Sequence, residues 1–172
     1  MNINLFFLFL IAGLSIIFFL FQPIQHIKKK ATEIPTLELE NFKLSELDTN
    51  GLTSIMNGKT GKKFLDRYVI TNIDYTDNTN KYIANIRSNN ALYKSDILHL
   101  DGDIKYFRED GLNFLTQKAS YNKKTSVMIS LTDYKSQMNQ NTVTGSYFEY
   151  NNATGITRSK NVKINYQLKE RK

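Results

Sequence analysis

Residues 161–168 read NVKINYQL, and this short stretch carries the pattern that decides the fold. Apolar side chains stand at every second position from Val162 to Leu168, with polar ones between them. Such a period of two predicts a half-buried β-strand, because successive side chains of a strand point to opposite faces. The same period recurs in residues 36–42 (TLELENF) and 127–131 (VMISL). Strands are therefore expected along most of the chain beyond residue 36.

Turn sequences separate these strands at intervals of about 8–12 residues, which favours an all-β sandwich, barrel or jelly roll. The turn signals are Asn50-Gly51, Asn57-Gly58, Asp77-Asn78, Asp110-Gly111, residues 122–124 and residues 152–155. Residues 44–56 are the one stretch that could form a turn or two of helix, although Gly51 weakens that interpretation.

A weak internal repeat supports the all-β interpretation. Tyr93, Tyr121 and Tyr150 stand at nearly equal intervals, and a second strand is expected after each. Repeated two-strand units stack well, because each unit buries one face on its neighbour. Chance spacing in a tyrosine-rich β protein is the alternative.

Composition excludes several classes of function. The 172 residues suffice for one domain with a short appendage. The absence of Cys excludes disulfides, thiolate zinc sites and cysteine nucleophiles, and two histidines, His26 and His99, exclude a multi-histidine metal site. Lys28–Lys30 supply three charges of the net charge of +7, and beyond residue 30 the charges are mixed without blocks of like charge, which argues against nucleic-acid binding.

No residues suggest catalysis, so an enzyme is not expected, and we predict no catalytic residue, metal ligand or cofactor. Asp101-Gly102-Asp103 lacks the further ligands of a calcium loop and is better explained as a turn or bulge between strands. His99 alternates with Leu98 and Leu100, so it is expected to face solvent. The chain has no nucleophile elbow, P-loop or dinucleotide fingerprint.

The N-terminal segment predicts a membrane anchor. Residues 3–21 (INLFFLFLIAGLSIIFFLF) are apolar on every face and would span roughly 28 Å as a helix, close to the thickness of a bilayer core. We therefore expect an anchor at 1–27, a basic, extended linker at 28–40 and a β domain at 41–172. A cleaved signal peptide is the alternative, but no basic residue precedes the apolar run and no Ala-x-Ala site follows it.

At this point the order of motifs resembles the LptC family and, more loosely, the OstA and LptA group. The motifs that carry the resemblance are Phe42-x-Leu44, Gly51-Leu52, Ala91-x-Tyr93, Leu100-x-Gly102-x-Ile104, Ala119-x-Tyr121-Asn122, Val143-x-Gly145-x-x-Phe148-x-Tyr150 and Asn161-Val162. Each motif is loose, and their order together with the anchor and the length gives the specificity. The resemblance covers nearly the whole chain.

The resemblance implies a twisted, open β-jelly roll of many short antiparallel strands, held in the periplasm by one helix in the inner membrane. It implies a carrier that accepts lipopolysaccharide from an inner-membrane ABC transporter and passes it to a periplasmic bridge protein. The expected lipid-facing residues are Leu100, Ile104, Tyr106, Phe114, Val127, Ile129, Leu131, Phe148, Tyr150, Val162 and Ile164. Any of them could instead pack a filled core, and a structural scaffold that binds no lipid is the alternative function.

The resemblance also implies two partner interfaces. The C-terminal strand would be an open edge that continues the sheet into an LptA-like protein through Val162, Lys163, Ile164 and Tyr166. The N-terminal helix would lie beside the transporter subunits, with Gly13 as the point of close approach. The basic cluster Lys28–Lys30 conflicts with this topology, because the positive-inside rule would put the β domain in the cytoplasm.

Overall fold

The computed structural model describes residues 33–49, 51–79 and 81–167. From Pro35 onward the chain forms one compact unit, which confirms the all-β prediction: a single 12-stranded sheet. Every strand pair in the described ranges is antiparallel. The strands are β1 (Leu37–Asp48), β2 (Gly51–Lys63), β3 (Tyr68–Asp77), β4 (Ala84–Lys94), β5 (Ile97–Arg108), β6 (Leu112–Asn122), β7 (Val127–Ser130), β8 (Tyr134–Met138), β9 (Asn141–Gly145), β10 (Tyr147–Asn151), β11 (Ile156–Lys160) and β12 (Lys163–Asn165).

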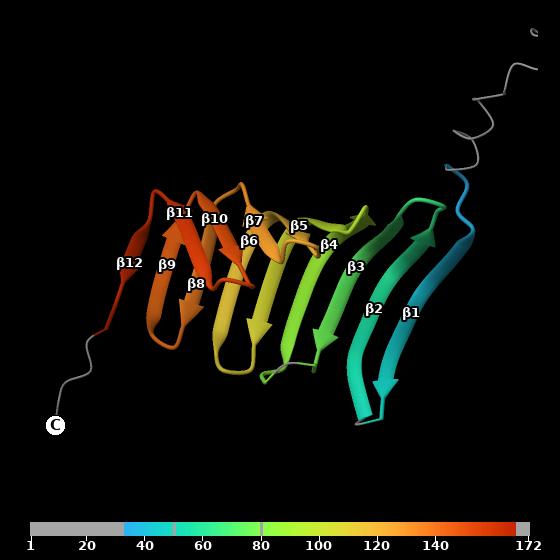
Figure 1. Cartoon of the computed structure of the whole chain (residues 1–172), viewed down its shortest axis with the longest axis horizontal. Helices are drawn as coiled ribbons and strands as arrows, with labels where there is room; N and C mark the ends of the chain where they lie inside the picture. Colours follow the sequence, from blue (N-terminus) through green and yellow to red (C-terminus); the bar gives the residue numbers. More distant parts are fainter. Residues whose placement is uncertain (1–32, 50, 80, 168–172) are drawn as a thin grey trace, which may run out of the picture. The chain divides into compact units, whose positions relative to one another are not determined.

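The sheet begins as a simple meander and then splits into two branches. Strands β1 to β6 pair in chain order, and β6 then has two partners. Its residues 120–122 pair with β7, which leads to β10 and β11. Its residues 112–116 pair with β8, which leads to β9 and β12. Figure 1 shows the meander running from β1 to β6 and the two branches beyond it.

A line of irregular backbone crosses the sheet at the middle of the strands. The pairing shifts register between Arg87 and Asn90 and again between Asp101 and Ile104, and Gly102 has a positive φ of 84°. Bulges of this kind bend a strand. We call this line the crease. It passes through Asn41, Asn72, residues 88–89, Gly102-Asp103, Gln117, residues 131–133, Ser146 and residues 161–162.

The crease divides the sheet into two layers. Layer A comprises β7, β10 and β11 with residues 37–40, 60–63, 68–71, 90–94, 97–101 and 118–122. Layer B comprises β8, β9 and β12 with residues 42–48, 51–57, 73–77, 84–88, 104–108 and 112–116. The short strands are the two halves of broken strands: β9 continues into β10 across Ser146, and β11 into β12 across Asn161.

Side chains of the two layers pack against each other beside the crease, and we call the faces that meet there the inner faces. Ala91 and Leu100 of layer A form one buried cluster with Ile73 and Ile104 of layer B. Further along the crease, the hydroxyl of the buried Tyr134 in layer B lies 2.8 Å from Oγ of Ser159 in layer A.

Buried polar groups at the crease are hydrogen-bonded. Ser130 is completely buried, and its hydroxyl lies 2.8 Å from that of Thr116, which in turn donates to the backbone oxygen of Asp133. Ser88 donates to the backbone oxygens exposed by the bulge, at 2.9 Å from Asn90 and 3.1 Å from Asp101. These contacts replace the ladder bonds that the bend interrupts.

One local expectation is wrong, and one is confirmed. Residues 44–48 and 51–56 belong to β1 and β2, so the helix left open for this stretch does not form there. Asn57-Gly58 is not a turn: Gly58 lies inside β2, where the ring of Phe42 covers it. The bulge expected at Asp101-Gly102-Asp103 is present.

The predicted anchor, with Gly13 and Lys28–Lys30, falls at residues 1–32 and so lies outside the described residues. In the part of the chain that is described, no helix is long and apolar enough to cross a membrane. Strand β1 begins at Leu37, inside the segment 28–40 that was expected to be a linker.

Candidate functional site

One row of side chains crosses the inner face of layer B from edge to edge. Directly paired residues of antiparallel strands point to the same face, so the register defines the row. It runs through Leu44, Met56, Tyr75, Ile86, Tyr106, Phe114, Ser136, Val143 and Ile164. Ser136 is its only aliphatic hydroxyl, and the row carries no charge. This row is therefore largely apolar along the whole sheet, whereas the next inward positions toward the layer B turns include Glu46, Ser54, Asp77 and Arg108.

Layer A presents a second row on its inner face, one step from the free turns. It runs through Tyr68, Tyr93, Leu98, Tyr121, Met128 and Tyr150. The rings of Tyr68 and Tyr93 lie 6.3 Å apart between centroids. We call these four tyrosines the tyrosine row.

On β5, the exposure of the inward side chains rises with distance from the crease. Leu100 is 5% exposed and Ile104 is 2% exposed, whereas Leu98 and Tyr106, two positions further out, are only half-buried. The inner faces therefore have a filled base beside the crease and a partly exposed apolar strip beyond it.

The two tyrosines of the layer B row are themselves uncharged. Burial raises the pKa of Tyr75 and of Tyr106 above the ordinary value of 10.0, so both remain neutral at physiological pH. Arg108, which lies beside Tyr106, is held by Asp110 through two hydrogen bonds of 2.8 Å.

Seven of the residues predicted to face lipid lie on the inner faces. They are Leu100, Ile104, Tyr106, Phe114, Phe148, Tyr150 and Ile164. Leu100, Ile104 and Phe114 are almost completely buried and pack the base. Tyr106, Phe148 and Tyr150 are half-buried, and Ile164 is 63% exposed.

The expectation that Val127, Ile129 and Leu131 share this wall needs correction. Ile129 pairs with Glu149, and Val127 with Asn151, so both side chains point to the outer face, opposite to Phe148 and its partner Ser130. Leu131 is 75% exposed in the break between β7 and β8. The period of two identifies the strand but not its inward side, and a shift of one residue exchanges the faces.

Sequence reasoning also missed inner-face residues, chiefly those of the first strands. Met56, Tyr75 and Ile86 lie in the layer B row, between Leu44 and Tyr106. Their alternation could have been found in β3, where apolar or aromatic residues stand at 73 and 75. In β2 the glycines at 58 and 61 interrupted the pattern.

The ends of the sheet are open edges. Strand β1 pairs only with β2, β11 only with β10, and β12 only with β9 within the described ranges. Of the residues predicted for a partner interface, Val162 is 45% exposed and Tyr166 is 68% exposed. Lys163 pairs with Thr144 on the outer face, next to the inward Ile164.

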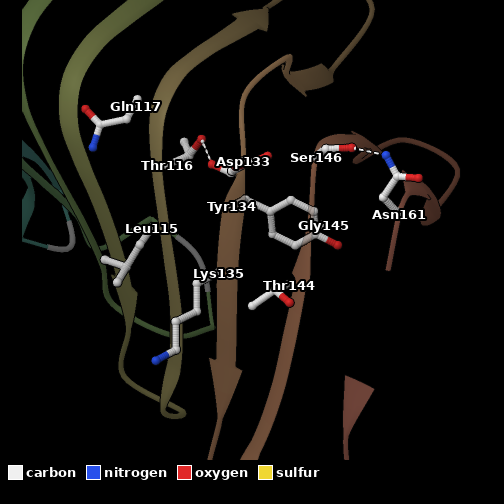
Figure 2. Close-up of a pocket in the computed structure, with 10 residues that line it drawn as sticks. All are labelled: Leu115, Thr116, Gln117, Asp133, Tyr134, Lys135, Thr144, Gly145, Ser146 and Asn161. Atoms are coloured by element: carbon white, nitrogen blue, oxygen red, sulfur yellow. Dashed lines mark hydrogen bonds between the residues drawn. The ribbon is translucent and has the colours of Figure 1, made fainter. Parts of the chain in front are cut away.

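A separate hollow of about 580 Å³ lies against the outer face of layer B, beside β8 and β9. Figure 2 shows Leu115, Lys135 and Thr144 among the side chains around it, and these three pair with one another on neighbouring strands. Asn161 closes one end by donating to Ser146 at 2.7 Å. This hollow is open and mixed in polarity, so the inner faces are the stronger candidate site.

No group of three or more His, Asp or Glu side chains in the described part of the chain is arranged to hold a metal ion. Its carboxylates mostly form ion pairs: Asp96 with Lys124 at 3.0 Å and Glu149 with Arg158 at 2.5 Å, for example.

Comparison with known proteins agrees with this geometry. The periplasmic component LptH of Pseudomonas aeruginosa, an LptA homologue of the lipopolysaccharide transport device, has a similar fold, with a TM-score of 0.51 and 12% sequence identity. The match covers 80% of this chain and 99% of that chain. It identifies the open sheet as an LptA-like jelly roll. No curated protein sequence matches the chain. The family model for lipopolysaccharide-assembly, LptC-related proteins matches residues 5–167, so the chain belongs to the LptC family.

Proposed function

We propose that this protein is a membrane-anchored periplasmic carrier of lipopolysaccharide. It accepts the lipid from an inner-membrane ABC transporter and passes it to an LptA-like bridge protein. Membership of the LptC family supports the substrate. The apolar residues 3–21 support the anchor, for which residues 1–27 are proposed.

The continuous layer B row is the observation that carries this proposal. Acyl chains need an apolar surface shielded from water, and the layer B row, half-buried from Met56 to Tyr106, offers one. We propose that acyl chains lie on the inner faces, against Tyr106, Phe148, Tyr150 and Ile164 above the base formed by Leu100, Ile104 and Phe114. Because the row reaches both edges and Ser136 is its only aliphatic hydroxyl, we propose that an acyl chain moves along it.

Adjacent residues on opposite faces give a matched test of lipid contact. The photo-crosslinking residue p-benzoylphenylalanine replaces Tyr106, which points inward, or Phe107, which is 49% exposed on the outer face. In cells that make lipopolysaccharide, we expect an adduct from position 106 and none from position 107. Equal adducts, or none from position 106 in a folded variant, would favour the structural scaffold instead.

The open edge at β12 supports a hand-off by strand addition, in which an incoming strand uses the free hydrogen-bonding groups of an edge. We propose that Val162, Lys163, Ile164 and Tyr166 contact the bridge protein. The same photo-crosslinker at Tyr166 should capture an LptA-like protein. At Tyr82, in the turn between β3 and β4, it should not. Capture of a second copy of this chain at Tyr166 would contradict the hand-off.

Topology can be tested directly, because the chain has no cysteine. A Ser95→Cys variant places a single thiol in the exposed turn between β4 and β5. We expect a membrane-impermeant maleimide to label it in intact cells whose outer membrane is permeabilised. Labelling only after cell lysis would put the domain in the cytoplasm, as the charge of Lys28–Lys30 alone would suggest.

A further inference from the structure

The free margins of the two layers carry opposite charge. Strands β1 to β6 each cross the crease once, and β7 to β12 are halves of strands that are broken at it, so the turns fall alternately at one margin and the other. The layer A margin consists of residues 63–68, 94–97, 122–127 and 151–156. The layer B margin consists of residues 48–49, 51, 77–79, 81–84, 108–112 and 138–141.

The layer A margin is basic. Its cations are Lys63, Arg67, Lys94, Lys123 and Lys124, against the carboxylates of Asp66 and Asp96. The layer B margin is acidic. Its carboxylates are those of Asp48, Asp77, Glu109 and Asp110, against Lys81 and Arg108. An anionic group at the opening between the layers is therefore attracted to the layer A side and repelled from the other.

The tyrosine row lies directly beneath the basic margin and contacts it. Lys63 Nζ stands 5.7 Å from the centre of the Tyr68 ring. The hydroxyl of Tyr93 donates to Asp96 at 3.2 Å, and Asp96 in turn pairs with Lys124 at 3.0 Å. Aromatic rings and cations thus form one surface at this margin.

Tyrosine suits the boundary between an apolar surface and water, because its ring is apolar and its hydroxyl is polar. The face of the ring carries partial negative charge, and the C–H groups on one side of a sugar ring carry partial positive charge, so the two attract. Lysines above the rings supply charge-assisted hydrogen bonds to phosphate. The layer A margin therefore matches both parts of a phosphorylated sugar.

We propose that the sugar–phosphate head of the carried lipid rests on the layer A margin, with its sugars against the tyrosine row and its phosphates beside Lys63, Lys123 and Lys124. This inference rests on the proposed function, since it takes the acyl chains to lie between the layers. It assigns the tyrosine row to recognition of the head and gives the bound lipid one orientation.

The test compares two probes on the full chain in detergent: purified lipid A, and myristic acid, which has an acyl chain but no sugar. In Tyr121→Leu the ring is lost and the apolar contact is kept. We expect its affinity for lipid A to fall about threefold to tenfold, the range of an aromatic contact, while that for myristate stays unchanged. Tyr121→Phe, which keeps the ring, should bind lipid A almost normally. The opposite-margin control Tyr82→Leu should bind both probes normally.

Charge is tested in the same way. The double variant Lys123→Gln with Lys124→Gln should lower the affinity for bisphosphorylated lipid A by about fivefold for each lysine removed. Its affinity for dephosphorylated lipid A should fall much less. Lys81→Gln at the layer B margin is the control and should leave both affinities unchanged. The assignment of the head to layer A is overturned if Tyr121→Leu and the double lysine variant bind lipid A normally. It is also overturned if their affinities for lipid A and for myristate fall equally. If the unaltered chain binds neither probe, the proposed carrier function itself fails.

Discussion

Phe114 and Phe148 come from opposite layers of the folded sheet, and their ring centroids lie 4.8 Å apart. Tyr134 completes the cluster, with its ring 5.3 Å from Phe114 and 5.2 Å from Phe148. These three rings join β6, β8 and β10, so they connect the two branches where backbone pairing between them ends. The cluster therefore holds the layers at a fixed separation beneath the proposed lipid site.

Replacing Phe114 should destabilise the fold. Phe114 is 6% exposed, and Phe114→Ala removes its contacts with both other rings. We expect the free energy of unfolding to fall by about 3–5 kcal/mol, measured by urea denaturation of the full chain in detergent. Phe107→Ala is the control, because Phe107 is 49% exposed on the outer face and should change the value by less than about 0.5 kcal/mol. A similar loss in both variants would show that the cluster has no special role.

Gly58 should not tolerate a side chain. A Cβ at this position would lie 2.6 Å from ring atoms of Phe42 and 3.0 Å from Cγ2 of Ile70. Gly58→Ala is therefore expected to cost about 1–3 kcal/mol of unfolding free energy, as overpacking does in other cores. Replacing the ring with a smaller side chain in Phe42→Leu should reduce that cost. A double-mutant cycle measures the coupling between positions 42 and 58. Additive effects of the two substitutions would contradict the contact.

The sequence predicted the strands better than their faces. Alternation and turn signals identified an all-β chain, because both depend on residues close together in the sequence. The inward side of β7 could not be deduced in this way. Ile129 and Ser130 are equally compatible with a strand, and only the pairing with β10 shows that Ser130 is the buried one.

The position of the crease could not be predicted from the sequence for a related reason. Many of its residues are Asn, Gly or Ser, which the sequence presents as ordinary turn formers; Asn57-Gly58, beside the crease in β2, was predicted as a turn for the same reason. In the fold the bends of neighbouring strands coincide, which is a property of the register. Two tyrosines of the weak sequence repeat do come together in the fold, because Tyr93 and Tyr121 pair with the same residue, Leu98, from either side.

At low pH the ion pair between Arg108 and Asp110 at the layer B margin should contribute less to stability. The guanidinium of Arg108 holds the pKa of the Asp110 carboxyl below its ordinary value of 3.8. A lowered pKa means that the folded state binds fewer protons, so this pair contributes stability above pH 3.8 that is lost as the pH falls through the folded value. The melting temperature of Asp110→Asn should therefore lie below that of the unaltered chain at neutral pH. The difference should shrink in acid.

Thermal melts of the full chain across this pH range check the sign. Glu38→Gln is the control, because it removes an ion pair with Lys62 whose side chains are 55% and 44% exposed, and such pairs contribute little. If the difference in melting temperature between Asp110→Asn and the unaltered chain grows on acidification, the ion pair between Arg108 and Asp110 is not its source.

Substitutions of Asn72 should change stability in the opposite order to that expected from β-propensity. It lies within β3 and is exposed, so β-propensity alone favours Val there. Its φ of 49°, however, is in the left-handed region, which Asn tolerates and a β-branched residue does not. Asn72→Val is therefore expected to lower the free energy of unfolding by about 1–2 kcal/mol, whereas Asn72→Gly at the same position should be close to neutral. Urea denaturation of the two variants in parallel decides the matter. If Val proves as stable as Gly or more so, β3 does not bend at Asn72, and the crease does not run through that strand.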